Sequence, residues 1–220
     1  MKVLSVVAKL LLIVAVPILV IITSIRILVN PLYPQFEYNT PNFPADPYGF
    51  TKADRLKYAE VSIDYLLNNS DLTYFNQFII DGSPMYNDRE RSHMQDVKTL
   101  IQNAFLAWGI IGIALVLAGV ISWQTKQLRP FFNALSTGGW TTLVIIGLIL
   151  VGVAISFNGL FTDFHRIFFT GDTWLFYYSD TLIRLFPMQF WQDGFIWMGV
   201  FAIIQALIIG VFGRMIARKF

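Results

Sequence analysis

The sequence predicts an all-α integral membrane protein with four transmembrane helices and an extracytoplasmic, mostly helical cap. Hydrophobic residues make up 55% of the 220-residue chain and charged residues only 14%, and the mean hydropathy of +0.58 is too high for an ordinary soluble domain. Four apolar runs are long enough to cross a hydrocarbon core of ~30 Å, which requires about 20 helical residues. All 14 acidic residues lie outside these runs, in two polar stretches.

These patterns divide the chain into eight segments. The predicted transmembrane helices occupy residues 1–28, 100–123, 138–158 and 194–213. A first part of the cap covers 29–99, an aromatic second part covers 159–193, and a cytoplasmic loop (124–137) and tail (214–220) complete the chain. The first apolar run is too long for the core of a signal peptide and no small-residue cleavage site follows it, so we interpret it as an uncleaved signal anchor.

The distribution of charge predicts the orientation in the membrane. The acids fall only in 29–99 and 159–193, whereas the loop and the tail carry basic residues and no acid. Short basic segments stay in the cytoplasm. Both termini are therefore expected in the cytoplasm and the cap outside it. The basic residues on the cytoplasmic side are Lys2, Lys126, Arg129, Arg214, Arg218 and Lys219.

The apolar runs themselves indicate packing rather than transport. Ala202, Ala206 and Gly210 repeat at every fourth position of the last run, and Ala114 and Ala118 do so in the second. Such stripes allow helices to approach closely in lipid. No acid lies at mid-depth of any run, which argues against a pump, channel or coupled transporter because these need ionisable groups there.

Local signals indicate the structure of the first cap segment. A proline-rich stretch at 30–47 favours loop, with a brief strand predicted at Gln35–Tyr38. Thr51 with Asp54, and later Asn87 with Glu90, have the spacing of helix N-caps and their partners. The second of these helices is expected to continue into the second span. Residues 81–84 (Asp-Gly-Ser-Pro) predict a turn between the two helices.

The second cap segment is dominated by aromatic residues around His165. Eleven of the residues in 159–193 are Phe, Tyr or Trp. Read as a helix, the stretch places His165 within an aromatic face, with Asp163 and Arg166 off that face. Gly171 ends this helix, and Asp180 is expected to cap a short second one that stops near Pro187. The plain interpretation is an aromatic belt at the membrane interface, and the alternative is a lipid-facing active site with a general base.

His93 and His165 are the only histidines of the chain, and the topology brings them to one level. His93 lies about seven residues before the second span and His165 about seven residues after the third. At 1.5 Å per residue, both are expected on the order of 10 Å beyond the hydrocarbon edge on antiparallel neighbouring helices. A histidine with an ordinary pKa near 6.5 can act as an acid or a base at neutral pH. The pair is therefore the leading candidate for catalysis.

Other chemistries have weaker support in the sequence. The chain has no cysteine, so it has neither a disulfide framework nor a thiolate nucleophile. Zinc remains an alternative, since the two histidines with Asp88, Asp96 or Asp163 would give three ligands, but no H-E-x-x-H motif is present. A serine triad is also an alternative, although Ser83 and Ser92 lack the G-x-S-x-G context. We expect no metal, no cofactor and no nucleic acid.

Three fragments carry a resemblance to a known family. They are YGFTKADRLKYAE, YNDRERSHMQDVK and FHRIFFTGDTWLFYYSDTLIRLFP, and the run F-H-x-I-F-F-x-G-D-x-W is the most specific part. The sequence resembles the lipoprotein intramolecular transacylases, the Lit family of Gram-positive membrane proteins, over nearly its whole length. The resemblance implies an enzyme of the bacterial cell membrane that uses two cap histidines, here His93 and His165.

The implied reaction takes place within one substrate molecule. One acyl chain moves from the glycerol sn-2 oxygen of a diacylglyceryl lipoprotein to the α-amine of its N-terminal cysteine, which gives a lyso-form lipoprotein. The partners implied are this lipoprotein and membrane lipid, and no external acyl donor is needed. Aromatic walls and several charged side chains are predicted to bind or orient the substrate. These secondary candidates are Tyr48, Phe50, Arg55, Arg89, Asp163, Arg166, Phe168, Phe169, Trp174 and Arg184.

Two functions of other kinds remain open from the sequence. One is a non-catalytic membrane protein whose cap binds a partner, which would tolerate the loss of both histidines. The other is an interfacial lipid acyl hydrolase, which would use water as its nucleophile and release free fatty acid.

Overall fold

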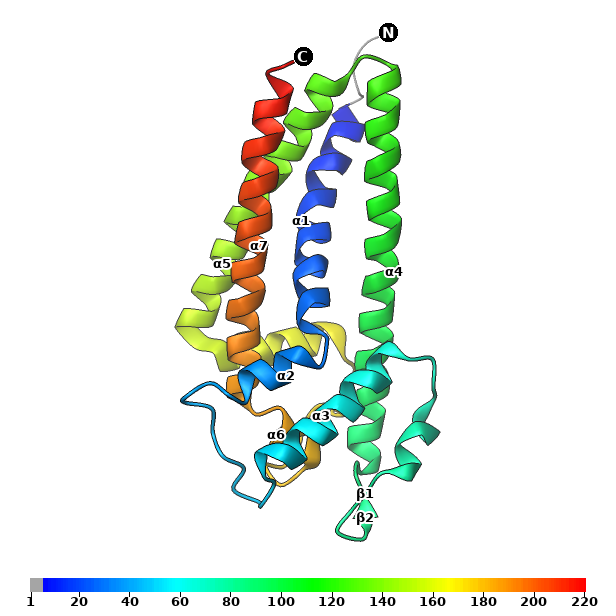
Figure 1. Cartoon of the computed structure of the whole chain (residues 1–220), viewed down its shortest axis with the longest axis vertical. Helices are drawn as coiled ribbons and strands as arrows, with labels where there is room; N and C mark the ends of the chain where they lie inside the picture. The colour runs from blue at the N-terminus through cyan, green and yellow to red at the C-terminus, as the bar shows by residue number, and fades with distance from the viewer. Residues whose placement is uncertain (1–5) are drawn as a thin grey trace. The chain divides into compact units, whose positions relative to one another are not determined.

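Residues 6–220 are described here by a computed structural model, and within them the predicted all-α membrane fold is confirmed (Figure 1). Four of the described helices are long and apolar enough to cross a membrane. These are α1 (Val6–Leu28), α4 (Asp88–Gln124), α5 (Leu128–Phe168) and α7 (Met188–Ala217). The shorter elements are α2 (Leu32–Glu37), α3 (Lys52–Leu67), a 3-10 helix (Leu72–Gln77), the two-residue strands β1 (Ile79–Ile80) and β2 (Ser83–Pro84), and α6 (Thr181–Leu185).

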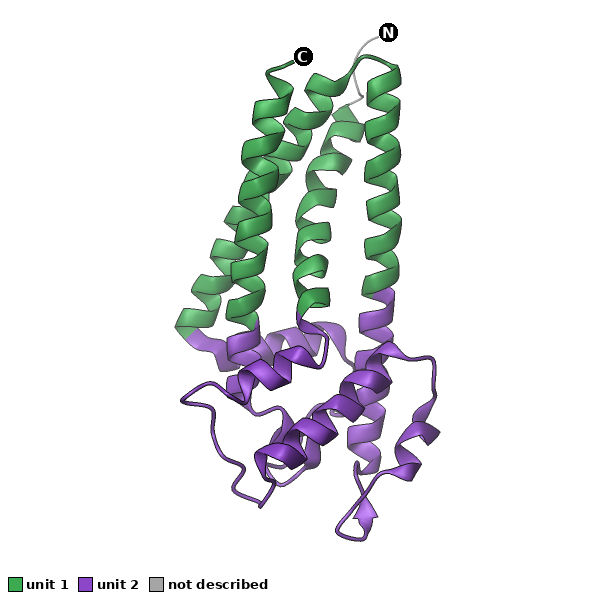
Figure 2. Cartoon of the chain, viewed as in Figure 1, with its two compact units in different colours: residues 1–27, 104–155, 195–220 green, residues 28–103, 156–194 purple. Residues whose placement is uncertain are grey.

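The chain forms two compact units (Figure 2). Unit 1 comprises Met1–Ile27, Ala104–Ile155 and Phe195–Phe220, and unit 2 comprises Leu28–Asn103 and Ser156–Gly194. Unit 1 therefore contains most of each long helix, and unit 2 contains both histidines. The boundaries of the eight predicted segments stay a prediction, and residues 1–5 of the first segment lie outside the described part of the chain.

Small residues bring α5 and α7 into close contact in unit 1. Ala202 and Ala206 are fully buried, and the Oγ atom of Ser136 donates a hydrogen bond of 2.7 Å to the Gly210 carbonyl. A Cβ atom on Gly139 would lie only 2.7 Å from the Gly210 nitrogen. The predicted small-residue stripe of the last span is thus a helix contact, as expected when backbones approach closely in lipid.

The prediction that Ala114 and Ala118 form a close helix contact was wrong. Ala114 is exposed on α4, and no residue in the most apolar window of that helix is buried. Ala118 only packs at the edge of a small cluster formed by Leu12, Phe131 and Ala134. The physical reason is that Ala114 faces away from the other helices, and that the large side chain of Phe131 packs beside Ala118 and Gly119.

Substitution of Gly139 by leucine is expected to destabilise the protein strongly. The new side chain would enter the backbone of α7, and overpacking of a filled core costs about 1–3 kcal/mol even where side chains can move. Thermal unfolding of the purified protein in detergent measures this effect. Gly147→Leu on the same helix is the control because a Cβ atom there has nothing within 4 Å. Equal unfolding temperatures for the two variants would contradict the described α5–α7 contact.

The caps of α3 and α4 in unit 2 follow the sequence signals, whereas Asp180 occupies the N-cap position of α6 without a capping hydrogen bond from its side chain. Thr51 and Asp54 form the reciprocal capping box at the start of α3. At the start of α4, the Asn87 side chain accepts from the Glu90 amide at 3.0 Å and Glu90 accepts from the Asn87 amide at 2.9 Å. The turn at Asp81–Gly82 has positive φ at both residues, as a two-residue hairpin requires. These confirmed caps fix the start of the helix that carries His93.

The strand predicted at Gln35–Tyr38 was wrong, because this segment belongs to the short helix α2 and its C-cap. Pro31 precedes the helix with a φ of −62°, which matches a helix start, and proline in the first turn removes no helical hydrogen bond. The hydroxyls of Tyr33 and Tyr38 then donate to the carbonyls of Phe190 and Leu185. Contacts distant in sequence therefore hold α2 in place.

The helix α5 has an interruption at Ser156, where φ is −160° and ψ is 91°. The Ser156 hydroxyl accepts a hydrogen bond of 3.2 Å from the Gly159 amide, in the way that an N-cap residue starts a new helix. The last part of α5 is therefore a separately capped segment of unit 2, and this segment carries His165.

Candidate functional site

The two histidines of unit 2 stack against each other. His93 comes from the start of α4 and His165 from the capped end of α5, and their ring centroids are 5.8 Å apart with an interplanar angle of 24°. Each residue is only 8% exposed. The juxtaposition predicted from the topology is thus present, with both rings withdrawn from bulk solvent.

Aromatic side chains enclose this histidine pair. The ring of Phe169 lies 4.9 Å from that of His93 and 5.3 Å from that of His165, so it contacts both. Phe176 packs on His93, and Trp174 packs on His165. Phe161, one turn before His165, approaches it to 4.1 Å. The aromatic face predicted around His165 is confirmed, and it provides a low-dielectric site.

Phe168 differs from the other predicted aromatic residues. Its side chain is 50% exposed and stacks on Phe164 at 4.7 Å, whereas Phe164 itself contacts His165. Phe168 is therefore one layer removed from the histidine pair.

Hydrogen bonding fixes the proton on one histidine. His165 Nδ1 lies 2.7 Å from the Phe161 carbonyl oxygen, which can only accept, so Nδ1 carries the proton. In the neutral ring the lone pair is then on Nε2, which is free to act as a base. His93 Nδ1 is buried, and within residues 6–220 it has no hydrogen-bond partner. The two histidines therefore have different roles available to them.

Burial keeps both histidines neutral at physiological pH. Both lie outside the predicted spans, in unit 2. Burial and then the charge of His165 lower the pKa of His93 to about 4, and burial also lowers the pKa of His165 although its bond to Phe161 opposes this. A neutral imidazole is the form that can accept a proton or donate an N–H bond without charge.

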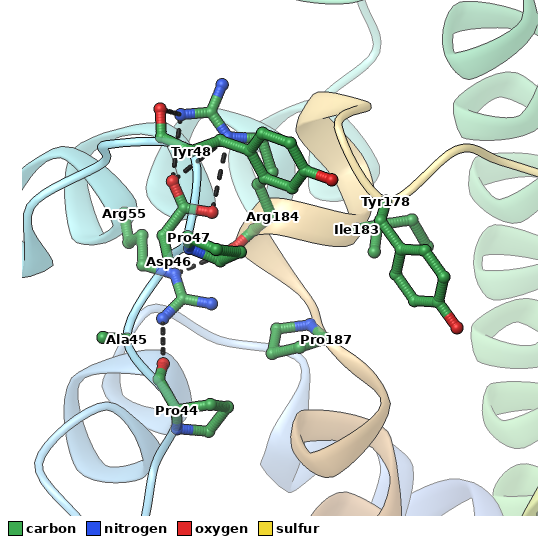
Figure 3. A pocket seen from close by; sticks show the side chains of 10 residues that line it. All are labelled: Pro44, Ala45, Asp46, Pro47, Tyr48, Arg55, Tyr178, Ile183, Arg184 and Pro187. Carbon is green, nitrogen blue, oxygen red and sulfur yellow. Dashed lines mark hydrogen bonds and ion pairs between the residues drawn. The ribbon is translucent and has the colours of Figure 1, made fainter.

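Four of the secondary candidates meet at a second position in unit 2. Arg184 pairs with Asp46 at 3.0 Å and its guanidinium lies 3.4 Å from the centre of the Phe50 ring. Arg55 donates to the Arg184 carbonyl at 2.8 Å, and Arg184 also donates to the Tyr48 carbonyl. Tyr48, Arg55 and Arg184 line a pocket of about 280 Å³ (Figure 3). Tyr48, Phe50, Arg55 and Arg184 thus form one cluster, which shares no residue contact with the histidine rings.

The remaining charged candidates lie apart from both clusters. Arg89 donates to the Leu175 carbonyl at 2.9 Å. Leu175 lies between Trp174 and Phe176, which pack on the histidines, so this bond holds their loop in place. Asp163 and Arg166 form a pair at 3.8 Å with side chains 72% and 69% exposed. In the part of the chain that the structure describes, neither of the two contacts His93 or His165. Their orienting role stays a prediction.

Sequence reasoning missed three acids that the structure makes important. Burial raises the pKa of Glu90 to about 7, although it accepts hydrogen bonds from the amides of Leu182 and Asn87. Burial and the nearby Asp193 carboxyl raise the pKa of Glu37 to about 7. Burial disfavours the ionised form of Asp46, yet hydrogen bonds from Arg184 and the Phe50 amide lower its pKa overall. Only Glu90 had a signal in the sequence, namely its capping position.

Two of the acids proposed for zinc have other partners. Asp96 accepts from the Thr173 hydroxyl at 3.3 Å and Asp163 pairs with Arg166. Between residues 6 and 220, no group of three or more His, Asp or Glu side chains has an arrangement that could hold a metal ion. Ser83, a candidate nucleophile, is exposed on the β1–β2 hairpin.

The fold and the site together define a multi-pass membrane protein with a desolvated pair of histidines in its second unit. The sequence model of one family, "Lipoprotein intramolecular transacylase Lit", matches residues 10–191. The chain belongs to this family and is accordingly an acyltransferase.

Individual proteins are similar to this chain over most of its length. An uncharacterised protein of Aquifex aeolicus (strain VF5) is 29% identical over 198 residues, which is 90% of this chain and 88% of that protein. The solved structure of the lipoprotein intramolecular transacylase Lit from Bacillus cereus is similar with a TM-score of 0.81, at 19% identity, over 96% of this chain and 94% of that chain. A structure of the same protein with a histidine-to-alanine mutation gives a TM-score of 0.75 at 20% identity, over 96% of this chain and 92% of that one. At this identity the structural likeness concerns the fold.

Proposed function

We propose that the protein transfers one acyl chain from the sn-2 glycerol oxygen of a diacylglyceryl lipoprotein to the α-amine of the same molecule's N-terminal cysteine. The observation that carries the proposal is the pair of stacked, neutral histidines in an aromatic enclosure. The nucleophile and the acyl donor both belong to the substrate, so the protein needs only to position them and to move protons.

His165 is the general base in this scheme. The substrate amine, with a reference pKa of about 8, first loses its ammonium proton. As the neutral amine attacks the sn-2 ester carbonyl, Nε2 of His165 accepts a further proton from the nitrogen. The Nδ1–H bond to the Phe161 carbonyl holds the ring and stabilises the imidazolium that forms. A C–N bond has then formed and the former carbonyl oxygen carries the negative charge.

His93 stabilises that charge. Its neutral ring donates an N–H to the oxyanion, and such a donor in a site that excludes water is worth about 3–4 kcal/mol. Collapse of the intermediate breaks the bond between the carbonyl carbon and the glycerol oxygen. The imidazolium of His165 gives its proton to the leaving oxygen, which restores both neutral rings and yields an amide and a free sn-2 hydroxyl.

Expression in a bacterial host that lacks lipoprotein N-acylation tests this function. Mass spectrometry of a purified host lipoprotein should find one acyl chain on the cysteine nitrogen and one on the glycerol. A lipoprotein with two glycerol chains and a free amine would support the binding function instead. Loss of one chain with release of free fatty acid would support the hydrolase.

We also propose that both termini lie in the cytoplasm and that the histidines lie at the outer membrane face. Within unit 1, the connection between α4 and α5 lies at the same end as the C-terminal end of α7 (Figure 1). All described charged side chains at this end are basic. Positive charge favours the cytoplasmic side.

Single cysteines test the orientation because the native chain has none. Glu60→Cys and Tyr177→Cys in unit 2 should react with an impermeant maleimide on intact cells, whereas Gln124→Cys should react only after lysis. All three positions are exposed. Labelling of Gln124→Cys alone on intact cells would overturn the orientation.

A further inference from the structure

The pocket beside Arg55 and Arg184 carries an unbalanced positive charge. Arg184 is paired with Asp46, and no carboxylate of residues 6–220 lies within ion-pair distance of Arg55. Arg55 is nonetheless only 5% exposed. The rings of Tyr38 and Phe43, with centres 5.4 and 5.0 Å from the guanidinium carbon of Arg55, stabilise this buried cation but do not neutralise its charge. The pocket is therefore suited to an anion.

The donors of Arg55 are only partly used within the protein. Its Nε donates to the Arg184 carbonyl at 2.8 Å and one terminal nitrogen donates to the Pro44 carbonyl at 2.6 Å. The other terminal nitrogen donates to no atom of the described chain. In Figure 3 the guanidinium of Arg55 lies above Pro44, to which a dashed line joins it, and Pro187 lies beside it on the other side of the pocket. A ligand oxygen is thus the fitting partner for the remaining donors, and carboxylates form strong bonds with guanidinium groups.

A short stretch of chain connects this pocket with the histidine pair. Trp174 packs on His165 and Phe176 packs on His93, whereas Tyr178 lines the pocket. Two residues of chain span at most ~7 Å, so the Cα atoms of Phe176 and Tyr178 lie within that distance. Both sites belong to unit 2. A peptide whose N-terminus is at the histidines can therefore reach the pocket within a few residues.

We propose that the pocket binds the peptide that follows the lipidated cysteine of the substrate, and that it selects an acidic side chain there through Arg55. The proposal rests on the proposed function, which places the cysteine amine at His165. Trp174 at His165 and Tyr178 at the pocket are separated by four residues, which span at most ~14 Å, so residues 3 to 5 of an extended lipoprotein are the candidates to meet the pocket. Proline and tyrosine side chains on its walls suit an extended peptide.

Matched synthetic lipopeptides test this specificity. Diacylglyceryl lipopeptides with Asp at residue 3, 4 or 5 are compared with the corresponding Asn peptides, and kcat/KM for O-to-N acyl transfer is measured by mass spectrometry with the purified full chain in neutral detergent. The best Asp peptide is expected to have a kcat/KM about 5- to 10-fold above its Asn partner, as a partly desolvated charge pair provides. Equal values for all pairs overturn the proposal, and absence of transfer with every peptide overturns the proposed function instead.

Two variants, each with a matched control, locate the preference in the pocket without removing Arg55, whose loss could unfold this region. Ala45→Glu adds a carboxylate at an exposed lining position and should abolish the preference for Asp, while the neutral Ala45→Gln should retain it. Tyr178→Ala should weaken binding of both peptides, whereas the exposed neighbour Tyr177, which does not line the pocket, should tolerate alanine. An Asp preference that survives Ala45→Glu unchanged contradicts this location.

An anionic lipid headgroup is the competing occupant of the pocket. Transfer rates are therefore also measured in micelles with and without phosphatidylglycerol. If added anionic lipid changes the rate with the wild-type chain but not with Ala45→Glu, and Asp and Asn peptides react equally, the pocket binds lipid and the proposal for the peptide is wrong.

Discussion

Replacement of His165 by alanine is expected to lower the rate of O-to-N acyl transfer by a factor of ~10² to 10⁴, the usual cost of losing a positioned general base. His165→Gln should be no better, because an amide cannot accept the amine proton at neutral pH. His93→Ala should cause a comparable loss, of about 10²- to 10³-fold for an oxyanion donor. His93→Gln should retain part of the activity because glutamine still donates a hydrogen bond.

Purified variants with a synthetic diacylglyceryl lipopeptide allow this comparison. Ile167→Ala and Gln95→Ala serve as controls, since both positions are exposed on the same helices as the histidines. The double variant, with both histidines changed to alanine, should be little worse than either single variant, because residues that act as a unit are not additive. Normal transfer by both well-expressed alanine variants would remove the histidines from the mechanism. Partial activity of His165→Gln, but not of His93→Gln, would exchange the two roles.

A plot of the logarithm of kcat/KM against pH is expected to be a straight line with a slope of about one near pH 6.5. The substrate amine must lose its proton, so the rate should rise about tenfold per pH unit up to the amine pKa near 8. Burial lowers the pKa of both histidines, that of His93 to about 4, so protonation of either ring is expected to begin at a lower pH than for an ordinary histidine. Between pH 7.5 and 6.5 the rate is therefore expected to change by about tenfold, from the amine alone.

Histidines with an ordinary pKa would give another profile. Protonation of His165 near pH 6.5 would add a second tenfold loss per unit below that pH. A slope that already increases toward two at pH 6.5 would therefore contradict the lowered pKa of His165. Gel filtration at each pH is the control, because a histidine whose pKa falls on folding contributes stability above pH 6.5 that is lost as the pH falls through the folded pKa.

The sequence predicted the elements that depend on local physics. Long apolar runs have only one stable form in lipid, so the four long helices followed from composition. The caps at Thr51 and Asn87 and the aromatic helix face around His165 depend on neighbours three or four residues away, and these predictions were confirmed. The approach of His93 to His165 followed from the short connection between two antiparallel helices.

The features that were missed depend on contacts between distant parts of the chain. The segment Gln35–Tyr38 is helical because Tyr33 and Tyr38 bond to carbonyls more than 140 positions away. The pairing of Asp46 with Arg184 spans 138 positions, and no local pattern announces it. The burial that raises the pKa of Glu37 is likewise created only when the whole of unit 2 has assembled.

The source of the acyl chain on the cysteine nitrogen tests the central claim most directly. Two diacylglyceryl lipopeptides of different peptide mass are mixed, and only one carries an isotopically labelled sn-2 chain. The purified protein should place label on the nitrogen of the labelled peptide alone, with its sn-1 chain unchanged and no free fatty acid formed. Label on the nitrogen of the other peptide, or label released as fatty acid, would contradict transfer within one molecule.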